Sequence, residues 1–188
     1  MELGRGYKHT EVGVIPGEWD VVRIGDIANV RTGPFGSALH ERDYVEDGTP
    51  IITVEHLGEF GVTHDNPPKV SDADRQRLRA YVLEEDDLVF SRVGSIDRNA
   101  LIRSMEAGWL FSGRLLRIRP NSGRAFSAYL SYQFHSEPFK QRVRSVAVGQ
   151  TMPSLNTKII SEVSIALPTL AEQRAIATIL SDVDALII

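Results

Sequence analysis

One stretch of the sequence concentrates residue types that can recognise nucleobases. The segment SRVGSIDRNALIR, Ser91 to Arg103, holds arginines, serines and an asparagine in a glycine-containing loop that follows a predicted strand. Arginine can donate two hydrogen bonds to a guanine edge, and the asparagine amide can pair with an adenine edge. We therefore predict that this loop contacts DNA, with base-edge contacts from Arg92, Ser95, Asn99 and Arg103 and a further contact from Arg98.

A second set of polar residues suits contact with phosphates or groove edges. Basic and apolar residues alternate over 111–119, which predicts a half-buried strand with a basic face, and three more basic residues recur at every second position of a predicted helix. Basic side chains of this kind contact DNA phosphates, although ion pairs with the acidic first half of the chain are an alternative for some of them. The predicted set is Arg117, Lys140, Arg142, Arg144 and Gln150.

The charge of the chain is unevenly distributed. The formal net charge of the 188 residues is −4, which alone does not suggest a nucleic-acid partner. Residues 1–88 carry a net charge of −9, residues 89–150 carry +7, and residues 151–188 carry −2. A phosphate backbone responds to the local field of a basic surface, so the middle segment can bind DNA. A solvated basic surface without a partner is the alternative.

Several motifs that could indicate catalysis or a cofactor are incomplete. Asn66-Pro67-Pro68 begins like a signature with which amino-methyltransferases hold a flipped base, but Lys69 replaces the stacking aromatic residue. The glycine loop TGPFGS at 32–37 lacks the lysine of a P-loop. The five histidines show no metal-ligand spacing, and cysteine is absent. We expect no catalytic residue, no metal and no cofactor.

The remaining patterns predict strands and helices in one mixed α+β domain. A helix is expected after Ser71, which can cap it, and two helical pieces are expected over 127–146, interrupted at Pro138. A short helical turn near Ser154 or Asn156 precedes a strand at 163–167. Further strands are expected near residues 19–30, 51–54 and 88–90. No segment has the apolar length of a signal peptide or a membrane span, so we expect a cytoplasmic protein without a membrane partner.

The last segment predicts an amphipathic helix with an unusual end. Pro168 ends the preceding strand, Thr169 can cap a helix, and Glu172 completes a capping box. The following apolar residues recur at alternating spacings of three and four, which is typical of a coiled-coil seam. We predict that a partner or a second copy buries this seam, whereas packing onto the domain's own surface is the alternative. The seam comprises Ile176, Ile179, Leu180, Val183, Leu186 and Ile187.

Five segments resemble, in the same order, the specificity subunit of type I restriction-modification enzymes. They are TEVGVIPGEWDVVRIGDI, GPFGSALHERDYVEDGTPIITVEHL, DDLVFSRVGSIDRNALI, FSGRLLRIRP and GQTMPSLNTKIISEVSIALPTLAEQRAIATIL. The resemblance covers nearly the whole chain. It implies an N-terminal extension at 1–18, a target recognition domain at 19–167, and the start of the conserved spacer helix at 168–188.

The resemblance implies a non-catalytic reader of double-stranded DNA. Such a subunit directs partner methyltransferase and restriction subunits to a bipartite target, and each of its two recognition domains reads one half. This chain has one such domain, so we expect either a shortened chain or a natural half-subunit. Two alternatives stay open: an assembly or anti-restriction scaffold that docks on the methyltransferase subunit without reading DNA, and an enzyme centred on Asn66.

Overall fold

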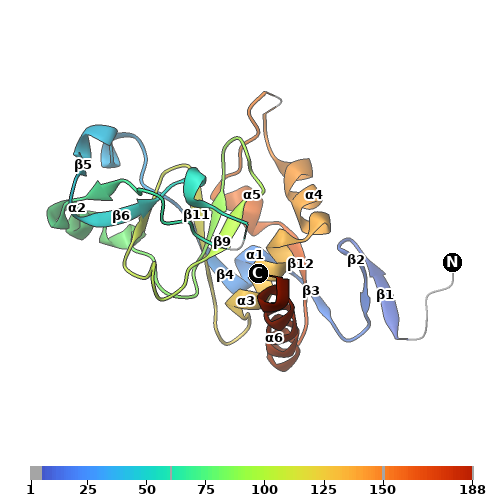
Figure 1. Ribbon diagram of the computed structural model, residues 1–188. Coiled ribbons are helices and arrows are strands. Elements are labelled where there is room, and N and C mark those ends of the chain that lie inside the picture. The colour runs from blue at the N-terminus through green and yellow to red at the C-terminus, as the bar shows by residue number, and fades with distance from the viewer. Residues whose placement is uncertain (1–5, 60, 150, 188) are drawn as a thin grey trace.

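A four-stranded antiparallel sheet with the strand order β4-β11-β8-β9 forms the centre of the fold (Figure 1). The computed structural model describes residues 6–59, 61–149 and 151–187 of the chain. The continuous apolar run of β8 favours burial on both faces, and every residue of β8 is indeed buried, as are residues 115–118 of β11. The strands are β4 (Ala28–Thr32), β8 (Leu88–Ser91), β9 (Asn99–Leu101) and β11 (Leu115–Pro120).

A smaller sheet with the order β10-β6-β7-β5 continues the molecule on one side. Its strands β10 and β6 are parallel, and the other pairs are antiparallel. The chain passes from β10 to the central β11 through residues 112–114 only. A Cβ on Gly33 would lie 2.1 Å from the Ser112 carbonyl oxygen, so this close crossing requires glycine. The strands are β5 (Tyr44–Val45), β6 (Thr49–Ile52), β7 (Lys69–Val70) and β10 (Leu110–Phe111).

Two helices, α3 (Ser127–His135) and α4 (Glu137–Val146), pack against the central sheet. Phe90 of β8 meets Phe134 and Phe139 edge to face, at centroid distances of 6.0 and 6.2 Å. The two helix phenylalanines stack on each other at 4.6 Å. This aromatic group forms the centre of the largest core cluster and fixes the position of α4 relative to the end of β8.

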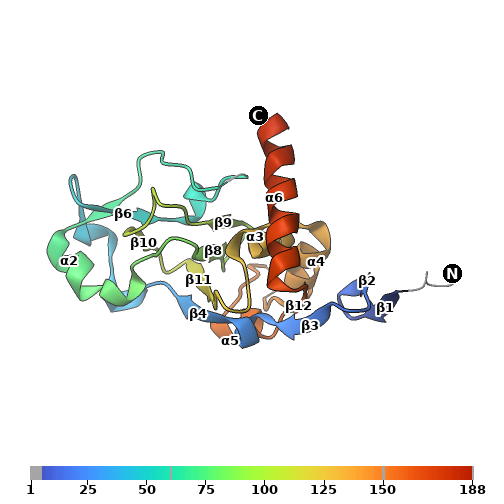
Figure 2. The ribbon, with the colours of Figure 1, turned by 90° about the horizontal axis from the view of Figure 1, so that it is seen from below.

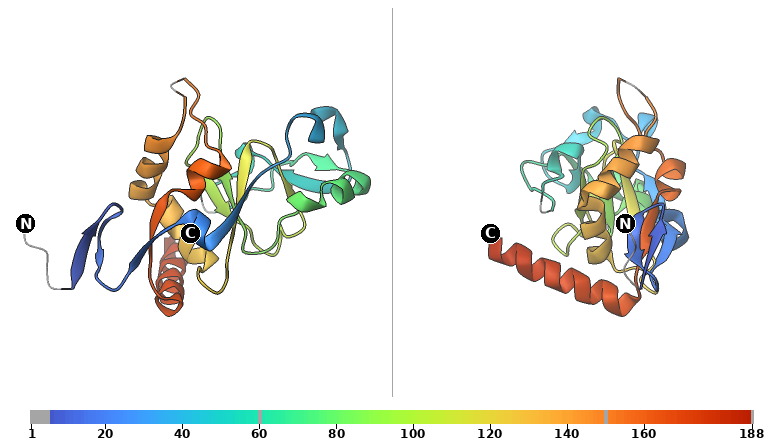
Figure 3. Two further views of the ribbon diagram at one scale, coloured as in Figure 1. Left: turned by 180° about the vertical axis from the view of Figure 1, so that it is seen from behind. Right: turned by 90° about the vertical axis from the view of Figure 1, so that its right-hand side faces the viewer.

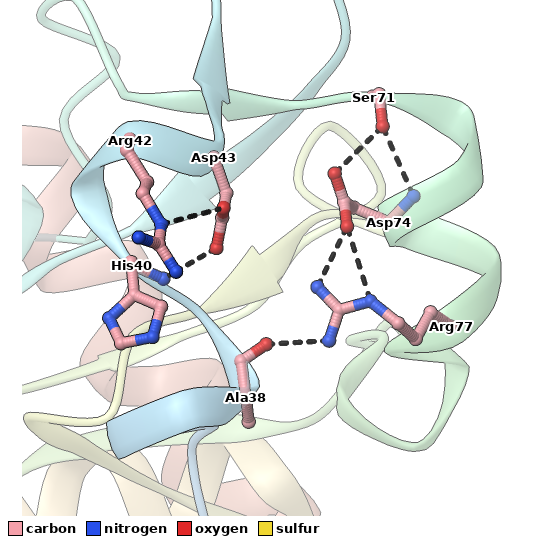
Figure 4. A network of polar contacts seen from close by, with 7 residues as sticks. All are labelled: Ala38, His40, Arg42, Asp43, Ser71, Asp74 and Arg77. Atoms are coloured by element: carbon pink, nitrogen blue, oxygen red, sulfur yellow. Dashed lines mark hydrogen bonds and ion pairs between the residues drawn. The ribbon is translucent and has the colours of Figure 1, made fainter.

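Helix α2 (Asp72–Arg77) is held by a polar network that Figure 4 shows from close by. Ser71 caps the helix, because its Oγ accepts a hydrogen bond from the Asp74 N–H over 3.1 Å. Arg77 pairs with the Asp74 carboxylate at 2.7 Å and donates to the Ala38 carbonyl at 2.7 Å. Hydrogen bonds from Arg77 and Ser71 hold the pKa of Asp74 below its usual value. The network thereby ties α2 to the segment around residues 36–43.

Short helices complete the connections. Helix α1 (Ile24–Ile27) packs beside α5 (Thr157–Ser161), whose N-terminus is capped by the Asn156 side chain. The single-turn 3-10 helices are η1 (Gly36–Ala38), η2 (Glu41–Asp43), η3 (Val54–His56) and η4 (Arg79–Tyr81).

The two ends of the chain extend from the domain. Strands β1 (Tyr7–Thr10) and β2 (Gly13–Pro16) form an antiparallel hairpin, and β3 (Asp20–Arg23) pairs with β12 (Ser164–Leu167). Helix α6 (Leu170–Ile187) leaves β12 and projects away from the sheets, so that its last turns lie beyond the rest of the domain (Figures 2 and 3).

The first turns of α6 are firmly attached. The buried Gln173 side chain accepts from the Phe126 N–H at 2.8 Å and donates to the Pro168 carbonyl at 2.9 Å. The predicted capping box is present, because the Thr169 N–H donates to Glu172 Oε2 at 3.0 Å and the Glu172 N–H donates to Thr169 Oγ1 at 3.4 Å.

The mixed α+β fold and the capped C-terminal helix are confirmed, and two local predictions are wrong. The interruption over 127–146 falls at Ser136, because α4 begins at Glu137 and Pro138 sits in its first turn, where proline is tolerated. The strand at 115–120 has no solvated basic face, because β4 and β8 flank it and core clusters cover both of its faces.

Candidate nucleic-acid interface

The loop between β8 and β9 is closed at its base by Ser91. The Ser91 N–H donates to the Arg98 carbonyl at 2.8 Å, and the Arg98 N–H donates to Ser91 Oγ at 3.1 Å. The Ser91 hydroxyl in turn donates to the Ser95 carbonyl. Gly94 has a φ of 76°, a conformation that favours glycine. The loop is therefore a defined turn whose tip presents Ser95 to solvent.

The Arg92 side chain points into the protein and hydrogen-bonds the β8–β9 loop to two other segments of the chain. Its Nε donates to the Leu155 carbonyl at 3.1 Å, and its Nη1 donates to the Gly113 carbonyl at 3.1 Å. The main chain repeats this connection, because the Arg92 N–H donates to the Arg114 carbonyl at 3.0 Å and the Leu155 N–H donates to the Arg92 carbonyl at 2.8 Å. These contacts give Arg92 a structural role, and its base contact stays a prediction.

Arg98 precedes β9 in the sequence, Arg103 follows it, and both side chains are exposed. The Arg98 guanidinium donates to the Leu57 carbonyl, which leaves its other N–H groups at the surface. The Arg103 N–H donates to Glu106 Oε2 at 2.9 Å, which fixes the main chain while the side chain stays exposed. Both positions permit DNA contact, which stays a prediction.

The three basic residues of α4 do not share one face. Because consecutive helical residues are about 100° apart, positions 140 and 144 lie together and position 142 points to the other side. Lys140 lines a pocket with Arg98, and Arg144 pairs with Asp97 and, at 2.8 Å, with Glu137. Arg142 is half-buried over the Phe139 ring at 5.8 Å. Lys140 is thus the member of this group best placed for a phosphate.

Arg117 is only 6% exposed, so it is not placed for phosphate contact. Its Nη2 donates to Asn29 Oδ1 at 2.9 Å, and burial lowers the pKa of its guanidinium. The neighbouring Arg119 donates through Nε and Nη2 to the two oxygens of Asp87, both at 2.7 Å. The basic residues of β11 therefore serve internal contacts.

Asn99 is 1% exposed and lines the same pocket as Arg98 and Lys140. Within the described residues, neither its Oδ1 nor its Nδ2 has a hydrogen-bond partner. The sequence pointed to Asn99, Arg98 and Lys140 but missed that His135, at the end of α3, joins them. No sequence signal links a helix end to a loop nearly forty positions away.

Gln150, the remaining predicted contact, lies outside the described residues.

The predicted seam of α6 divides into a buried and an exposed part. Ile176 packs against the domain's own core, which is the packing that the alternative prediction described. Farther along, Ile179, Val183 and Leu186 are 63%, 46% and 87% exposed, and Leu180 is 37% exposed. The side chain of Ile187 is outside the described residues. The exposed part of the seam starts at Ile179, about one turn after Ile176.

Among the described residues, no group of three or more potential metal ligands occurs. Asn66, with a φ of 51°, lies in an irregular segment before β7, and the Pro68 carbonyl accepts from the Ile51 N–H at 2.8 Å. No described helix is long and apolar enough to cross a membrane.

The exposed polar residues of the β8–β9 loop and one face of α4 lie on a scaffold built around a buried sheet. The chain belongs to the family of type I restriction modification DNA specificity domains, whose family model matches residues 16–188.

The specificity subunits that this chain resembles in sequence are longer than the chain. It is 32% identical over 189 residues to the putative type I restriction enzyme MjaX specificity subunit of Methanocaldococcus jannaschii, covering 96% of this chain and 43% of that subunit. It is 22% identical over 187 residues to the MjaVIII specificity subunit of the same organism, covering 97% of this chain and 43% of the subunit. The chain therefore spans less than half the length of these relatives.

Solved structures share the fold. The HsdS subunit from Thermoanaerobacter tengcongensis aligns with a TM-score of 0.68 at 18% identity, over 96% of this chain and 40% of that one. A chain from a study of complex assembly and conformational transition of the type I R-M system aligns with a TM-score of 0.72 at 19% identity, over 96% and 41% of the two chains.

Proposed function

We propose that this chain reads one half of a bipartite DNA target as a non-catalytic specificity subunit of a type I restriction-modification system, and that it directs partner methyltransferase and restriction subunits to that site. The observation that carries the proposal is the family match over residues 16–188. Residues 19–167 would form the target recognition domain, and residues from 168 onward would begin the spacer helix. In this arrangement, double-stranded DNA contacts the domain and the partner subunits supply the chemistry.

The arrangement of charges supports a contact surface around the β8–β9 loop. Ser95 and Arg98 are exposed there, and Lys140 approaches from α4. The ion pair between Arg144 and Asp97 connects α4 with the loop, and Arg98 and Lys140 line one pocket there. Fixed cationic groups can position a DNA backbone while neighbouring polar groups read base edges.

A selection from randomised double-stranded DNA tests this function. The protein is assembled with the methyltransferase subunit, bound sequences are recovered, and the enriched motif is compared with that from the methyltransferase subunit alone. We expect one ordered motif that requires this chain. An assembled complex that enriches no motif would instead favour a scaffold that docks without reading DNA.

The exposed seam of α6 supports a second element of the proposal, which is association through this helix. Apolar side chains at Ile179, Val183 and Leu186 recur on one side of a helix that projects from the domain. Such a stripe is suited to a coiled coil with a second copy or a partner helix.

Sedimentation over a range of concentrations tests self-association through the seam. We expect the protein to associate with rising concentration and Val183→Asp to remain monomeric. Thr178→Asp is the matched control, because Thr178 is exposed on α6 but lies outside the seam. A concentration-independent monomer for the unchanged protein would contradict self-association.

A further inference from the structure

A pocket that is partly open to solvent lies beside the buried Asn99. It has a volume of about 260 Å³ and lies between the β8–β9 loop, the turn at Leu57 and the helices α3 and α4. Asn99 and Leu101 occupy alternate positions of β9 and so face the same side, where Leu101 packs on the core that includes α3 and α4. This alternation directs the Asn99 amide to the pocket side of the sheet.

The amide of Asn99 lacks partners that its burial would normally require. A side-chain amide has two donor positions and an acceptor, and buried polar atoms are almost always hydrogen-bonded. In the described part of the chain, both Oδ1 and Nδ2 of Asn99 lack a partner. An unpaired donor beside an unpaired acceptor fits a ligand edge that offers the opposite pair.

The other groups of the pocket are mixed in chemistry. Arg98 and Lys140 supply positive charge and the exposed Glu59 a negative one, while Asp97 is already engaged by Arg144. His135 Nδ1 lies 2.8 Å from the Ser131 carbonyl, so in the neutral ring Nε2 is an acceptor. A site for a phosphate alone would need only hydrogen-bond donors, whereas this pocket also has hydrogen-bond acceptors beside its donors. A volume of about 260 Å³ is also slightly below the range of about 300–1,000 Å³ that suits drug-sized molecules.

We infer that this pocket receives a single nucleobase that has left the helical stack, with Asn99 pairing to its hydrogen-bonding edge. The inference rests on the proposed function. An amide that is 1% exposed cannot reach a base inside a duplex, so the base must come to the amide. Lys140 lines the pocket and is placed for the phosphate of the same nucleotide. The side chains that enclose the Asn99 amide would move aside for the base to reach it, because its Oδ1 and Nδ2 are closed off in this structure.

Selection from randomised DNA with Asn99→Asp tests the inference. The variant keeps the shape of the side chain and removes its donor, so we expect discrimination at one target position to fall roughly ten- to a hundred-fold, with the other positions unchanged. Asn121→Asp is the control for the added charge, because Asn121 lies outside the pocket and uses its Oδ1 to accept from the Gly123 N–H.

The possible outcomes separate the inference from the proposed function. If the unchanged protein enriches no motif, the proposed function fails. If it enriches a motif that Asn99→Asp leaves unchanged, the function stands and the pocket does not read a base. A uniform loss of affinity at all positions would assign the pocket to a phosphate and overturn the inference.

Fluorescence then tests extrusion of the base. With 2-aminopurine at the affected position, binding of the unchanged protein should raise the fluorescence because the base is unstacked, and Asn99→Leu should reduce the rise. Circular dichroism and the melting temperature of both Asn99 variants establish that they are folded. An unchanged fluorescence on binding by the unchanged protein would overturn extrusion.

Discussion

Replacing Arg92 by alanine should destabilise the protein more than it weakens DNA binding. Arg92 donates to the Leu155 and Gly113 carbonyls, both at 3.1 Å, and so connects the β8–β9 loop with two other segments. A hydrogen bond that involves a charged group contributes about 1.5–3 kcal/mol to stability. Because the Arg92 side chain is half-buried, water can replace part of the contribution of these hydrogen bonds. We expect the free energy of unfolding to fall by about 2–3 kcal/mol for the two bonds together.

The loss is large enough for thermal unfolding to measure. In a chain of this size, 1 kcal/mol shifts the melting temperature by about 2–4 °C, so Arg92→Ala should lower it by roughly 4–12 °C. Arg92→Lys should recover little, because an ammonium group cannot span both carbonyls as the planar guanidinium does. Arg98→Ala is the control, since Arg98 is exposed and makes one such bond.

DNA binding by the same variants decides between the two roles of Arg92. After correction for the folded fraction, Arg92→Ala should bind with nearly unchanged affinity and an unchanged motif. A variant that melts like the unchanged protein but loses discrimination at one base would refute the structural role and restore the base contact that the sequence suggested.

Three further predictions concern charge. Asp87→Ala should lower the free energy of unfolding by about 1–3 kcal/mol in denaturant titration, because Arg119 loses its buried partner and keeps Glu84, and the Glu84 N–H loses its acceptor; equal stability would contradict this. Arg98→Ala and Arg103→Ala should weaken DNA binding at low salt, each lowering the slope of log affinity against log salt by about 1, and a loss that does not shrink at high salt would oppose a phosphate contact. Because the pKa of Asp74 is lowered in the folded protein, its ionised carboxylate stabilises the fold fully above the pKa of the unfolded carboxyl, and this stability is lost as pH falls through the folded pKa. Asp74→Asn should therefore reduce the fall of the melting temperature with falling pH. An unchanged fall would show that other carboxylates account for it.

Local signals in the sequence were sufficient for most elements. The caps at Ser71, Asn156 and Thr169 are formed by side chains within three residues of the N–H groups they accept from, so short spacing alone revealed them. The strand at 88–91 and the C-terminal helix also follow from periodicity over one segment.

Partners far apart in the chain could not be predicted. Arg92 bonds to a carbonyl 63 positions away, and Arg119 pairs with Asp87 across 32 positions. Alternation on β11 suggested a basic surface, but core clusters cover both faces of this strand, and its arginines meet Asn29 and Asp87. Sequence identified the charges, whereas only the tertiary structure shows which of them remain available to DNA.

Mapping of methylated sites tests the central claim most directly. The methyltransferase subunit is expressed in an unmethylated host with this protein, with Asn99→Asp, or alone, and modified positions are located by sequencing. We predict one recurring motif that appears only with this protein. A complex that assembles and methylates without any sequence preference, or with the motif of the methyltransferase subunit alone, would contradict the assignment of this chain as the reader of the DNA target.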